Sequence, residues 1–328
     1  MNILITGAAG FIGSRVGEML ALAGHTITGV DNYNDYYDPK LKHDRVARVQ
    51  DALKTAKSAG HTVGTFTVLT GDITDEAFMT STFQQYAPER IIHLAAMAGV
   101  RYSVSHPLRY VDTNVRGTTL LLELAHQHNV GHVVYASTSS VYGSNTVYPF
   151  TEDQPTERQL SPYAATKKAT ELMAHVYYHL YQLPVTGLRF FTVYGPWGRP
   201  DMGVSTFVRD ILTGQPLTLY TGATELKRSF TYIDDIAAGI IASLEHPNGY
   251  QLLNIGGGES APVTEYIALV EKYAGKKAII ITADKPAADV EVTDADTSKL
   301  RALGWSPDTP LATGVKNLVE WYRQYHKV

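Results

Sequence analysis

The chain has 328 residues, 44% of them apolar and 18% charged, which is ordinary for a soluble globular protein with one large α/β domain or two modest ones. A net charge of −4 gives no electrostatic reason to expect nucleic acid, and no apolar run approaches the roughly 18–20 residues of a membrane span. The chain has no cysteine, and its 12 histidines show no metal-ligand spacing, so we expect no disulfide, no cysteine nucleophile and no metal. There is no signal-peptide pattern after Met1, and we expect a cytoplasmic protein.

Apolar runs alternate with helix-length segments through the first half of the chain. Residues 11–24 have helical spacing that ends at Gly24, whereas the runs typical of buried strands stand at 2–6, 26–30, 65–72, 90–96, 132–137 and 184–190. Strands that alternate with helices indicate a parallel sheet covered on both faces. We therefore predict an α/β fold with a doubly wound parallel sheet.

The second half of the chain is less regular. Residues 194–203 are rich in proline and glycine, and shorter elements follow them. Segments 228–246 and 250–258 look like a helix and a strand that return to the first sheet. We predict a first domain over 1–190, with a returning segment at about 230–256. A smaller C-terminal α/β domain is predicted over 191–229 and 257–328.

A glycine-rich turn, GAAGFIG, follows the first predicted strand and opens the first helix. Gly7, Gly10 and Gly13 lack the Cβ that would obstruct a tight turn, a close approach to a pyrophosphate and helix–sheet contact. The helix N-terminus, which includes Phe11 and Ile12, offers free N–H groups and the positive end of its dipole to phosphates. An ordinary strand-to-helix turn is the alternative for a glycine triplet taken alone.

The end of the second predicted strand strengthens the dinucleotide interpretation. Asp31 lies 18 residues after the last glycine of the turn, where a carboxylate accepts hydrogen bonds from a ribose 2′-OH and repels a 2′-phosphate. This pattern predicts a Rossmann domain that binds NAD rather than NADP, with an N-cap or turn residue as the alternative for Asp31. Asn32 belongs to the same predicted site, and Asp72 and Ile73 follow the third strand where they could hold an adenine. Asp75 is expected to cap a helix.

A third signal lies at residues 136–167. Ser161 predicts an N-cap, and Tyr163 and Lys167, four residues apart, share one face of the helix that follows. A neighbouring ammonium and a cationic nicotinamide would both lower the pKa of a phenol from its usual value near 10, which makes proton transfer feasible. The stretch ASTSSVYG places Thr138 at the carboxyl end of a strand, where open α/β sheets bind ligands.

Together, in this order, the three signals resemble the extended short-chain dehydrogenase/reductase family, and the resemblance spans nearly the whole chain. It implies that Tyr163 is the catalytic base and acid, and that Lys167 holds the nicotinamide ribose and lowers the tyrosine pKa. It also implies that Thr138 bridges Tyr163 and the substrate oxygen.

The residues after Thr138 narrow the reaction. Dehydratases of this family typically carry Asp-Glu there, and UDP-glucuronate decarboxylases Ser-Glu, whereas this chain has Ser139 and Ser140. The missing acids favour simple 4-epimerisation. Segments 31–42, 97–107 and 188–202 resemble the UDP-glucuronate 4-epimerases, and Thr192 stands where UDP-galactose 4-epimerases usually carry Asn. The resemblance therefore implies interconversion of UDP-glucuronate and UDP-galacturonate. A UDP-glucose/UDP-galactose epimerase, a net dehydrogenase or reductase, and a non-catalytic NAD-binding sensor remain alternatives.

Several further residues are candidates for the nucleotide sugar. Neutral donors suit the carboxylate of a uronic acid, and Ser139, Ser140 and Thr192 are placed there. For Arg199 and Arg101 the sugar, a phosphate and a plain surface salt bridge all stay open.

Three expectations rest on the resemblance alone. Arg228 matches the arginine that clamps the diphosphate, and Asp289, in KPAADV, is what remains of a Gly-Asp-Val segment near the nucleotide. A homodimer is expected through helices near 107–128 and 161–182.

Overall fold

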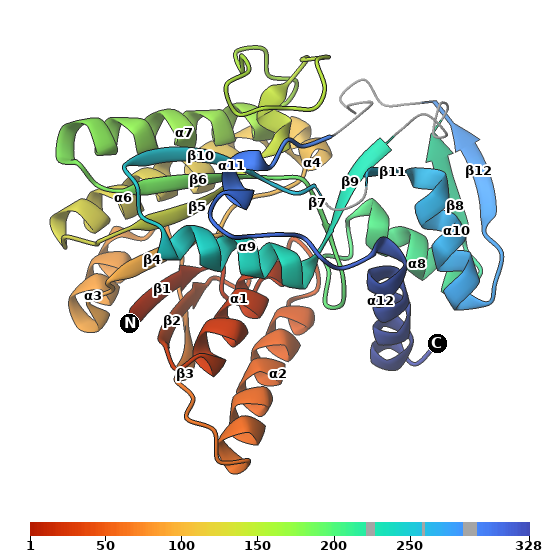
Figure 1. Cartoon of the computed structure of the whole chain (residues 1–328), viewed down its shortest axis with the longest axis horizontal. Coiled ribbons are helices and arrows are strands. Elements are labelled where there is room, and N and C mark those ends of the chain that lie inside the picture. Colours follow the sequence, from red (N-terminus) through yellow and green to blue (C-terminus); the bar gives the residue numbers. More distant parts are fainter. Residues whose placement is uncertain (221–226, 258–259, 285–293) are drawn as a thin grey trace.

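The computed structural model describes residues 1–220, 227–257, 260–284 and 294–328, and its centre is a parallel sheet (Figure 1). Within these residues, seven strands pair in the order β10-β6-β5-β4-β1-β2-β3. Their bounds are β1 (Asn2–Thr6), β2 (Thr26–Asp31), β3 (Thr65–Thr70), β4 (Arg90–His93), β5 (Val133–Thr138), β6 (Val185–Phe190) and β10 (Tyr250–Ile255). Every pairing is parallel, so the predicted doubly wound sheet is confirmed.

Helices cover both faces of this sheet. One face carries α1 (Phe11–Leu22), α2 (Pro39–Ser58) and α9 (Ile233–Glu245), and the other carries α3 (Glu76–Tyr86), α6 (Gly117–Gln127) and α7 (Pro162–Tyr181). Along β1 the side chains alternate, because Ile3 and Ile5 join the first apolar cluster while Leu4 joins the second. Burial on both faces explains why the strands are continuous apolar runs.

Local capping sets the ends of two helices as the sequence predicts. Asp75 accepts a hydrogen bond from the Phe78 amide at 3.0 Å and caps α3. Ser161 accepts one from the Ala164 amide at 3.1 Å and caps α7, with proline at the first helical position. The positions of Tyr163 and Lys167 on α7 are thus fixed from the start of the helix.

The strands at 65–72 and 90–96 are shorter than predicted. They end at Thr70 and His93, because Gly71 and residues 94–96 leave the sheet to line a cavity at its carboxyl edge. The chain order reverses between β1 and β4, which is the topological switch point where open α/β sheets bind ligands.

A smaller region lies beyond the carboxyl ends of the strands, on the right of Figure 1. It contains a three-stranded sheet, β11-β9-β7, and a two-stranded one, β12-β8, within the described residues. The strands are β7 (Thr192–Tyr194), β8 (Pro216–Tyr220), β9 (Lys227–Tyr232), β11 (Ser260–Pro262) and β12 (Ile279–Ala283). The helices of this region are α8 (Gly203–Thr213), α10 (Val263–Ala274) and α12 (Leu311–His326).

The remaining helical segments connect these layers. They are α4 (Val100–Ser105), α5 (Pro107–Tyr110), the π-helical η1 (Val111–Arg116), the 3-10 turn η2 (Ser139–Tyr142) and α11 (Ser298–Arg301). Apolar residues of both regions, such as Ile5 and Val270, belong to one cluster. No break in this core marks the predicted domain boundaries, which stay a prediction. Across the described part of the chain, no helix has the length and apolarity that crossing a membrane requires.

Candidate active site

A cavity of about 1090 Å³ lies where the central sheet meets the smaller region. It brings together residues from the glycine-rich turn, the strand ends, α7 and the loops of the smaller region. Predicted site residues that line it are Gly7, Gly10, Phe11, Ile12, Gly13, Asp31, Asn32, Ile73, Arg101, Thr138, Ser139, Ser140, Tyr163, Lys167, Thr192, Arg199 and Arg228. Asp72 lies behind this surface, and Asp289 lies outside the described residues.

The glycine-rich turn has no room for side chains. Gly7 has a φ of +72°, and a Cβ there would lie 2.8 Å from the Ala95 amide nitrogen. A Cβ on Gly13 would lie 2.2 Å from the carbonyl oxygen of Gly7. Gly10 caps α1 without a side chain, so the helix N-terminus is open towards the cavity. This cradle fits the pyrophosphate of a dinucleotide.

Asp31 is buried at the cavity wall and holds the surrounding loops together. Its carboxylate accepts hydrogen bonds from the amides of Ala9 at 3.2 Å and Tyr33 at 2.9 Å. Lys42 of α2 adds a buried ion pair at 3.1 Å. Asp31 therefore acts as a turn residue, which was the alternative interpretation, and it also faces the cavity where a ribose would lie. The two roles are compatible, because a carboxylate has about four lone-pair sites.

Asn32 and Asp72 form one unit beside Asp31. The Asn32 amide donates to the Asp72 carboxylate at 2.7 Å, and the amide and hydroxyl of Thr74 donate to the same carboxylate. Burial opposes ionisation of Asp72, but these hydrogen bonds outweigh it and hold its pKa below the usual value. Ile73 and Asn32, rather than Asp72, form the surface next to the cavity.

The hydroxyl row at the end of β5 faces the start of α7. Thr138 donates to the Ser140 hydroxyl at 3.3 Å and accepts from the Ser140 amide at 3.2 Å. Its hydroxyl is also hydrogen-bonded to Tyr163. Lys167 lies one turn further along α7, where its ammonium donates to the carbonyl of Ala136 at 2.8 Å. Thr138, Tyr163 and Lys167 therefore meet as the sequence predicts.

The predicted effect of Lys167 on the pKa of Tyr163 stays a prediction. Burial raises the pKa of Tyr163, and the hydrogen bond with Thr138 and the charge of Arg199 lower it. Lys167 donates to the carbonyl of Ala136, and its own burial lowers its pKa to about 8. Arg199, from the loop after β7, is thus a further cation that favours the phenolate.

Arg199 is held in place by its own loop. Its guanidinium forms a bidentate ion pair with Asp201, at 3.1 and 2.6 Å, and lies 5.6 Å from the ring centroid of Tyr36. The Tyr36 hydroxyl donates to the same Asp201 carboxylate at 3.2 Å. Burial alone would lower the pKa of Arg199, but Asp201 holds it above the usual value. A salt bridge, one of the interpretations left open for Arg199, is thus formed with Asp201, and both residues line the cavity.

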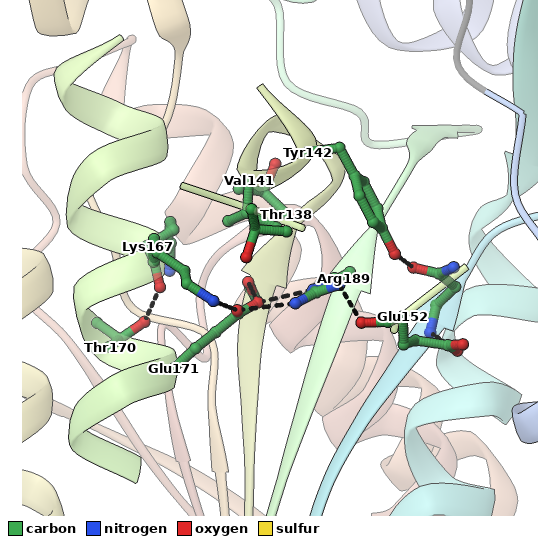
Figure 2. A network of polar contacts seen from close by, with 12 residues as sticks. Thr138, Val141, Tyr142, Glu152, Lys167, Thr170, Glu171 and Arg189 are labelled. Carbon is green, nitrogen blue, oxygen red and sulfur yellow. Dashed lines mark hydrogen bonds and ion pairs between the residues drawn. The ribbon is translucent and has the colours of Figure 1, made fainter. Parts of the chain in front are cut away.

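A buried network lies directly beneath this site (Figure 2). Glu171, one turn after Lys167 on α7, accepts hydrogen bonds from Arg189 of β6 at 2.8 and 3.0 Å and from the Ser137 hydroxyl at 2.7 Å. Arg189 also donates to the carbonyl of Glu152 at 3.1 Å. The network ties the helix that carries Lys167 to the strand that ends at Thr138.

The remaining substrate candidates come from the smaller region and from α4. Thr192 begins β7 and Arg228 lies on β9, and both line the cavity. The guanidinium of Arg101 lies 5.2 Å from the ring centroid of Tyr220 on β8. All three residues line the cavity, and their roles toward the sugar, the diphosphate and the base stay predictions.

Sequence reasoning missed the partners that hold the predicted residues. Lys42 and Asp201 carry charges at the cavity wall, and although they lie in segments 31–42 and 188–202, which carry the resemblance, no role was predicted for either. Tyr36 is one of three tyrosines that follow Asp31, and the choice between a cover for the adenosine and a packed surface loop was open. The repetition of tyrosine after a cofactor aspartate was the one available signal.

Comparison with known proteins agrees with this geometry. Residues 3–256 match the NAD dependent epimerase/dehydratase family. A UDP-glucuronate 4-epimerase of Thermodesulfobacterium geofontis is 44% identical over 98% of this chain and 96% of its own length. The crystal structure of UDP-glucuronic acid 4-epimerase from Bacillus cereus, in complex with UDP-glucuronic acid and NAD, is 32% identical. It covers 99% of this chain and 100% of the other, with a TM-score of 0.89.

A second solved structure represents the neutral-sugar branch. UDP-glucose 4-epimerase from Thermotoga maritima, with UDP-glucose, is 30% identical over 99% of this chain and 100% of the other, with a TM-score of 0.87. The family predicted from the motifs is thereby confirmed. The chain belongs to the NAD dependent epimerase/dehydratase family, whose pattern covers both its glycine-rich turn and its tyrosine–lysine helix.

Proposed function

We propose that the protein is an NAD-dependent 4-epimerase of the cytoplasm that interconverts UDP-glucuronate and UDP-galacturonate. The observation that carries this proposal is the row of neutral hydroxyls in the cavity. Thr138, Ser139, Ser140 and Thr192 all line it, and Ser139 and Ser140 stand where a dehydratase or decarboxylase would carry an acid. The relatives named UDP-glucuronate 4-epimerase support the choice of sugar.

The cofactor fits the half of the cavity nearest α1. The glycine-rich cradle would hold the pyrophosphate, and Asp31 would accept from the adenosine ribose, with Ile73 and Asn32 beside the base. The ammonium of Lys167 would bind the hydroxyls of the nicotinamide ribose. When bound, NAD accepts a hydride from C4 of the sugar and later returns it.

Tyr163 would accept and return the proton of the C4 hydroxyl. Its phenolate would take this proton, either directly or through the hydrogen-bonded hydroxyl of Thr138, and give it back when the 4-keto sugar has presented its other face. Burial opposes the phenolate and raises the pKa of Tyr163, and the hydrogen bond with Thr138 and the positive charge of Arg199 act in the opposite direction. The acid–base role of Tyr163 thus depends on Thr138, at the end of β5, and on Arg199, in the loop after β7.

The carboxylate of the sugar sets a second requirement. Oxidation at C4 gives a β-keto acid, which loses CO₂ readily when its carboxylate stands perpendicular to the ketone plane. Ser139, Ser140 and Thr192 would hold the carboxylate near that plane through charge-assisted hydrogen bonds, without offering an acid that protonates C5. We place Arg199 next to the sugar, because its charge acts on Tyr163.

The nucleotide end is proposed from the resemblance. Arg228 would clamp the diphosphate and Arg101 would lie at the sugar or diphosphate, since both face the cavity. Asp289 would belong to the segment near the nucleotide.

We also propose that two copies pair through α5–α6 and α7. Exposed apolar side chains lie on α4, α5, η1 and α7, and Leu108 is 75% exposed and Leu172 59% exposed. The others are Val104, Val111, Val176 and Leu180. A contiguous apolar surface on paired helices is what an antiparallel helix bundle between two copies would cover.

The test is incubation of the purified protein with UDP-glucuronate, followed by chromatography of the products. We expect UDP-galacturonate at equilibrium with no lasting NADH absorbance. UDP-xylose as the main product would make the protein a decarboxylase. Lasting NADH would make it a dehydrogenase. A higher kcat/KM for UDP-glucose than for UDP-glucuronate would favour the neutral-sugar epimerase, and retention of activity in Tyr163→Phe would refute the mechanism.

A further inference from the structure

Arg45 of α2 is a cation in the interior of the protein, with 0% of its surface exposed. Within the described residues, its hydrogen bonds all end on neutral oxygen atoms. Nε and Nη2 donate to the carbonyl of Trp197 at 3.0 and 2.6 Å, and Nη2 also donates to the carbonyl of Gly198 at 3.3 Å. Nη1 donates to the carbonyl of Ala9 at 3.3 Å and to the hydroxyl of Tyr37 at 2.6 Å.

Burying a charge in a protein core costs free energy when no carboxylate forms an ion pair with it. Replacement by well-packed apolar residues is often neutral or stabilising for buried ionic groups, so stability alone gives weak reason for Arg45. A guanidinium has five N–H donors in a fixed plane, which lets it span several acceptors at once. Here the three carbonyl acceptors belong to two loops, and the Tyr37 hydroxyl belongs to the segment between β2 and α2.

The two loops are the glycine-rich turn, which contains Ala9, and the turn over residues 195–201, which contains Arg199. The second turn has little regular hydrogen bonding of its own, with Gly198 N donating to Gly195 O at 3.2 Å. Trp197 adopts a φ of +66°, a left-handed conformation that is strained for a residue with a side chain. Arg45 thus holds the strained residue through two hydrogen bonds to its carbonyl.

Packing fixes the outer side of the same turn. The indole of Trp197 lies 5.4 Å from Trp321 and 5.1 Å from Tyr325 of α12, measured between ring centroids. These contacts fix the indole, whereas Arg45 fixes the carbonyls that face the glycine-rich turn. Both constraints act on the two residues directly before Arg199, whose charge reaches Tyr163.

We propose that Arg45 is a positioning residue that locks the 195–201 turn against the glycine-rich turn, and so sets where Arg199 lies relative to Tyr163 and the sugar. Arg45 touches neither ligand in this scheme, since it is absent from the residues that line the cavity. The part that concerns Arg199 and the sugar rests on the proposed function. The part that concerns the two turns does not.

The first experiment measures the turn itself, by amide hydrogen exchange on the whole protein without substrate. Arg45→Lys keeps the charge but cannot span the same acceptors, and we expect exchange in peptides over 195–202 to rise by about tenfold through local opening. The control is Arg301→Lys on α11, since Arg301 also donates to neutral oxygens, those of Thr297 and Ser306 at 3.2 Å each, but these lie outside the 195–201 turn. Unchanged exchange over 195–202 in Arg45→Lys, or an equal rise over the whole chain, would overturn the inference.

The second experiment asks whether Arg45 acts through Arg199. With Arg199 present, Arg45→Lys should lower kcat/KM for UDP-glucuronate by roughly 10²-fold, as misplaced catalytic groups do. In an Arg199→Gln background it should change kcat/KM by less than about twofold. Equal losses in both backgrounds would mean a merely structural role and would overturn the proposal.

A pH profile separates positioning from loss of fold. Arg45→Lys should move the ascending limb of kcat/KM to higher pH, because a displaced Arg199 no longer lowers the pKa of Tyr163. The other groups that face Arg199 are Asp201 and Tyr36, and Tyr110 also feels its charge. NAD affinity, titrated directly, should weaken by only a few-fold, since one of these hydrogen bonds reaches the glycine-rich turn. If the wild-type protein does not turn over UDP-glucuronate, the proposed function fails, and the exchange experiment still decides the inference about the two turns.

Discussion

Substitution of Glu171 by glutamine tests the buried network beneath the catalytic residues. The side chains of Glu171 and Arg189 are each 1% exposed, and the carboxylate accepts two hydrogen bonds from Arg189, one from Ser137 and a longer one from Lys168 at 3.4 Å. A glutamine offers one oxygen and turns an N–H group towards a guanidinium that has only donors. Burial opposes the charge of Arg189, but Glu171 holds its pKa above the usual value, so Arg189 stays charged and unpaired in the variant.

The expected loss of stability follows from that unpaired charge. Removing one partner of a buried ion pair costs about 3–5 kcal/mol. An unfolding entropy of about 2.1 cal/mol/K per residue amounts to about 0.7 kcal/mol/K for 328 residues. The midpoint of thermal unfolding should therefore fall by about 4–7 °C. The kcat should fall as well, because Glu171 connects the helix of Lys167 to the strand of Thr138.

Denaturant titration followed by circular dichroism measures the free energy of unfolding. Glu320→Gln serves as the control, since Glu320 forms an exposed pair with Lys316 at 3.8 Å and should lose no more than about 0.5 kcal/mol. Replacing both Glu171 and Arg189 by methionine should cost less than the two single substitutions together, because no charge is then left unpaired. A loss for Glu171→Gln as small as that of the control would refute this account of the network.

Four further outcomes are expected. Tyr163→Phe should lower kcat by about 10²–10⁴-fold while NAD titration shows unchanged affinity, and a smaller loss would assign the proton to another group. Arg199→Gln should shift the ascending limb of the kcat/KM pH profile to higher pH, since the positive charge lowers the pKa of Tyr163, and an unshifted limb would contradict the assignment. Asp31→Asn should weaken NAD more than NADP in direct titration, because the carboxylate that repels a 2′-phosphate is gone, and an equal loss would remove Asp31 from the ribose site. Leu172→Glu combined with Leu108→Glu should leave a folded monomer in light scattering, and a persistent dimer would place the interface elsewhere.

Local sequence patterns were sufficient for the parts of this protein that depend on neighbours in the chain. The parallel sheet follows from apolar runs that alternate with helices, and the cradle of the glycine-rich turn follows from residues without Cβ directly after β1. The caps Asp75 and Ser161 need only the amides two or three residues ahead. The tyrosine and lysine four apart on α7 also share a face for a local reason.

The partners of the site residues were beyond reach of these patterns, because such contacts depend on how the chain folds back on itself. Lys42 reaches Asp31 from 11 residues further along the chain, and Arg45 meets the carbonyl of Trp197 across 152 positions of sequence. Neither contact leaves a spacing that a reader of the sequence could recognise.

The pKa of Tyr163 likewise depends in part on neighbours in the sequence and in part on the tertiary structure. Its identity and its helical spacing to Lys167 are sequence facts, and they predict a lysine that lowers its pKa. In the tertiary structure Lys167 donates to the carbonyl of Ala136, and Arg199 of the loop after β7 adds a second positive charge that lowers the same pKa. Sequence alone thus determined which residues gather at the carboxyl edge of the sheet, since strand order and helix spacing place them there. Only the tertiary structure decided that a cation from another loop also acts on the phenol, because electrostatic influence depends on distance and burial in space rather than on separation along the chain.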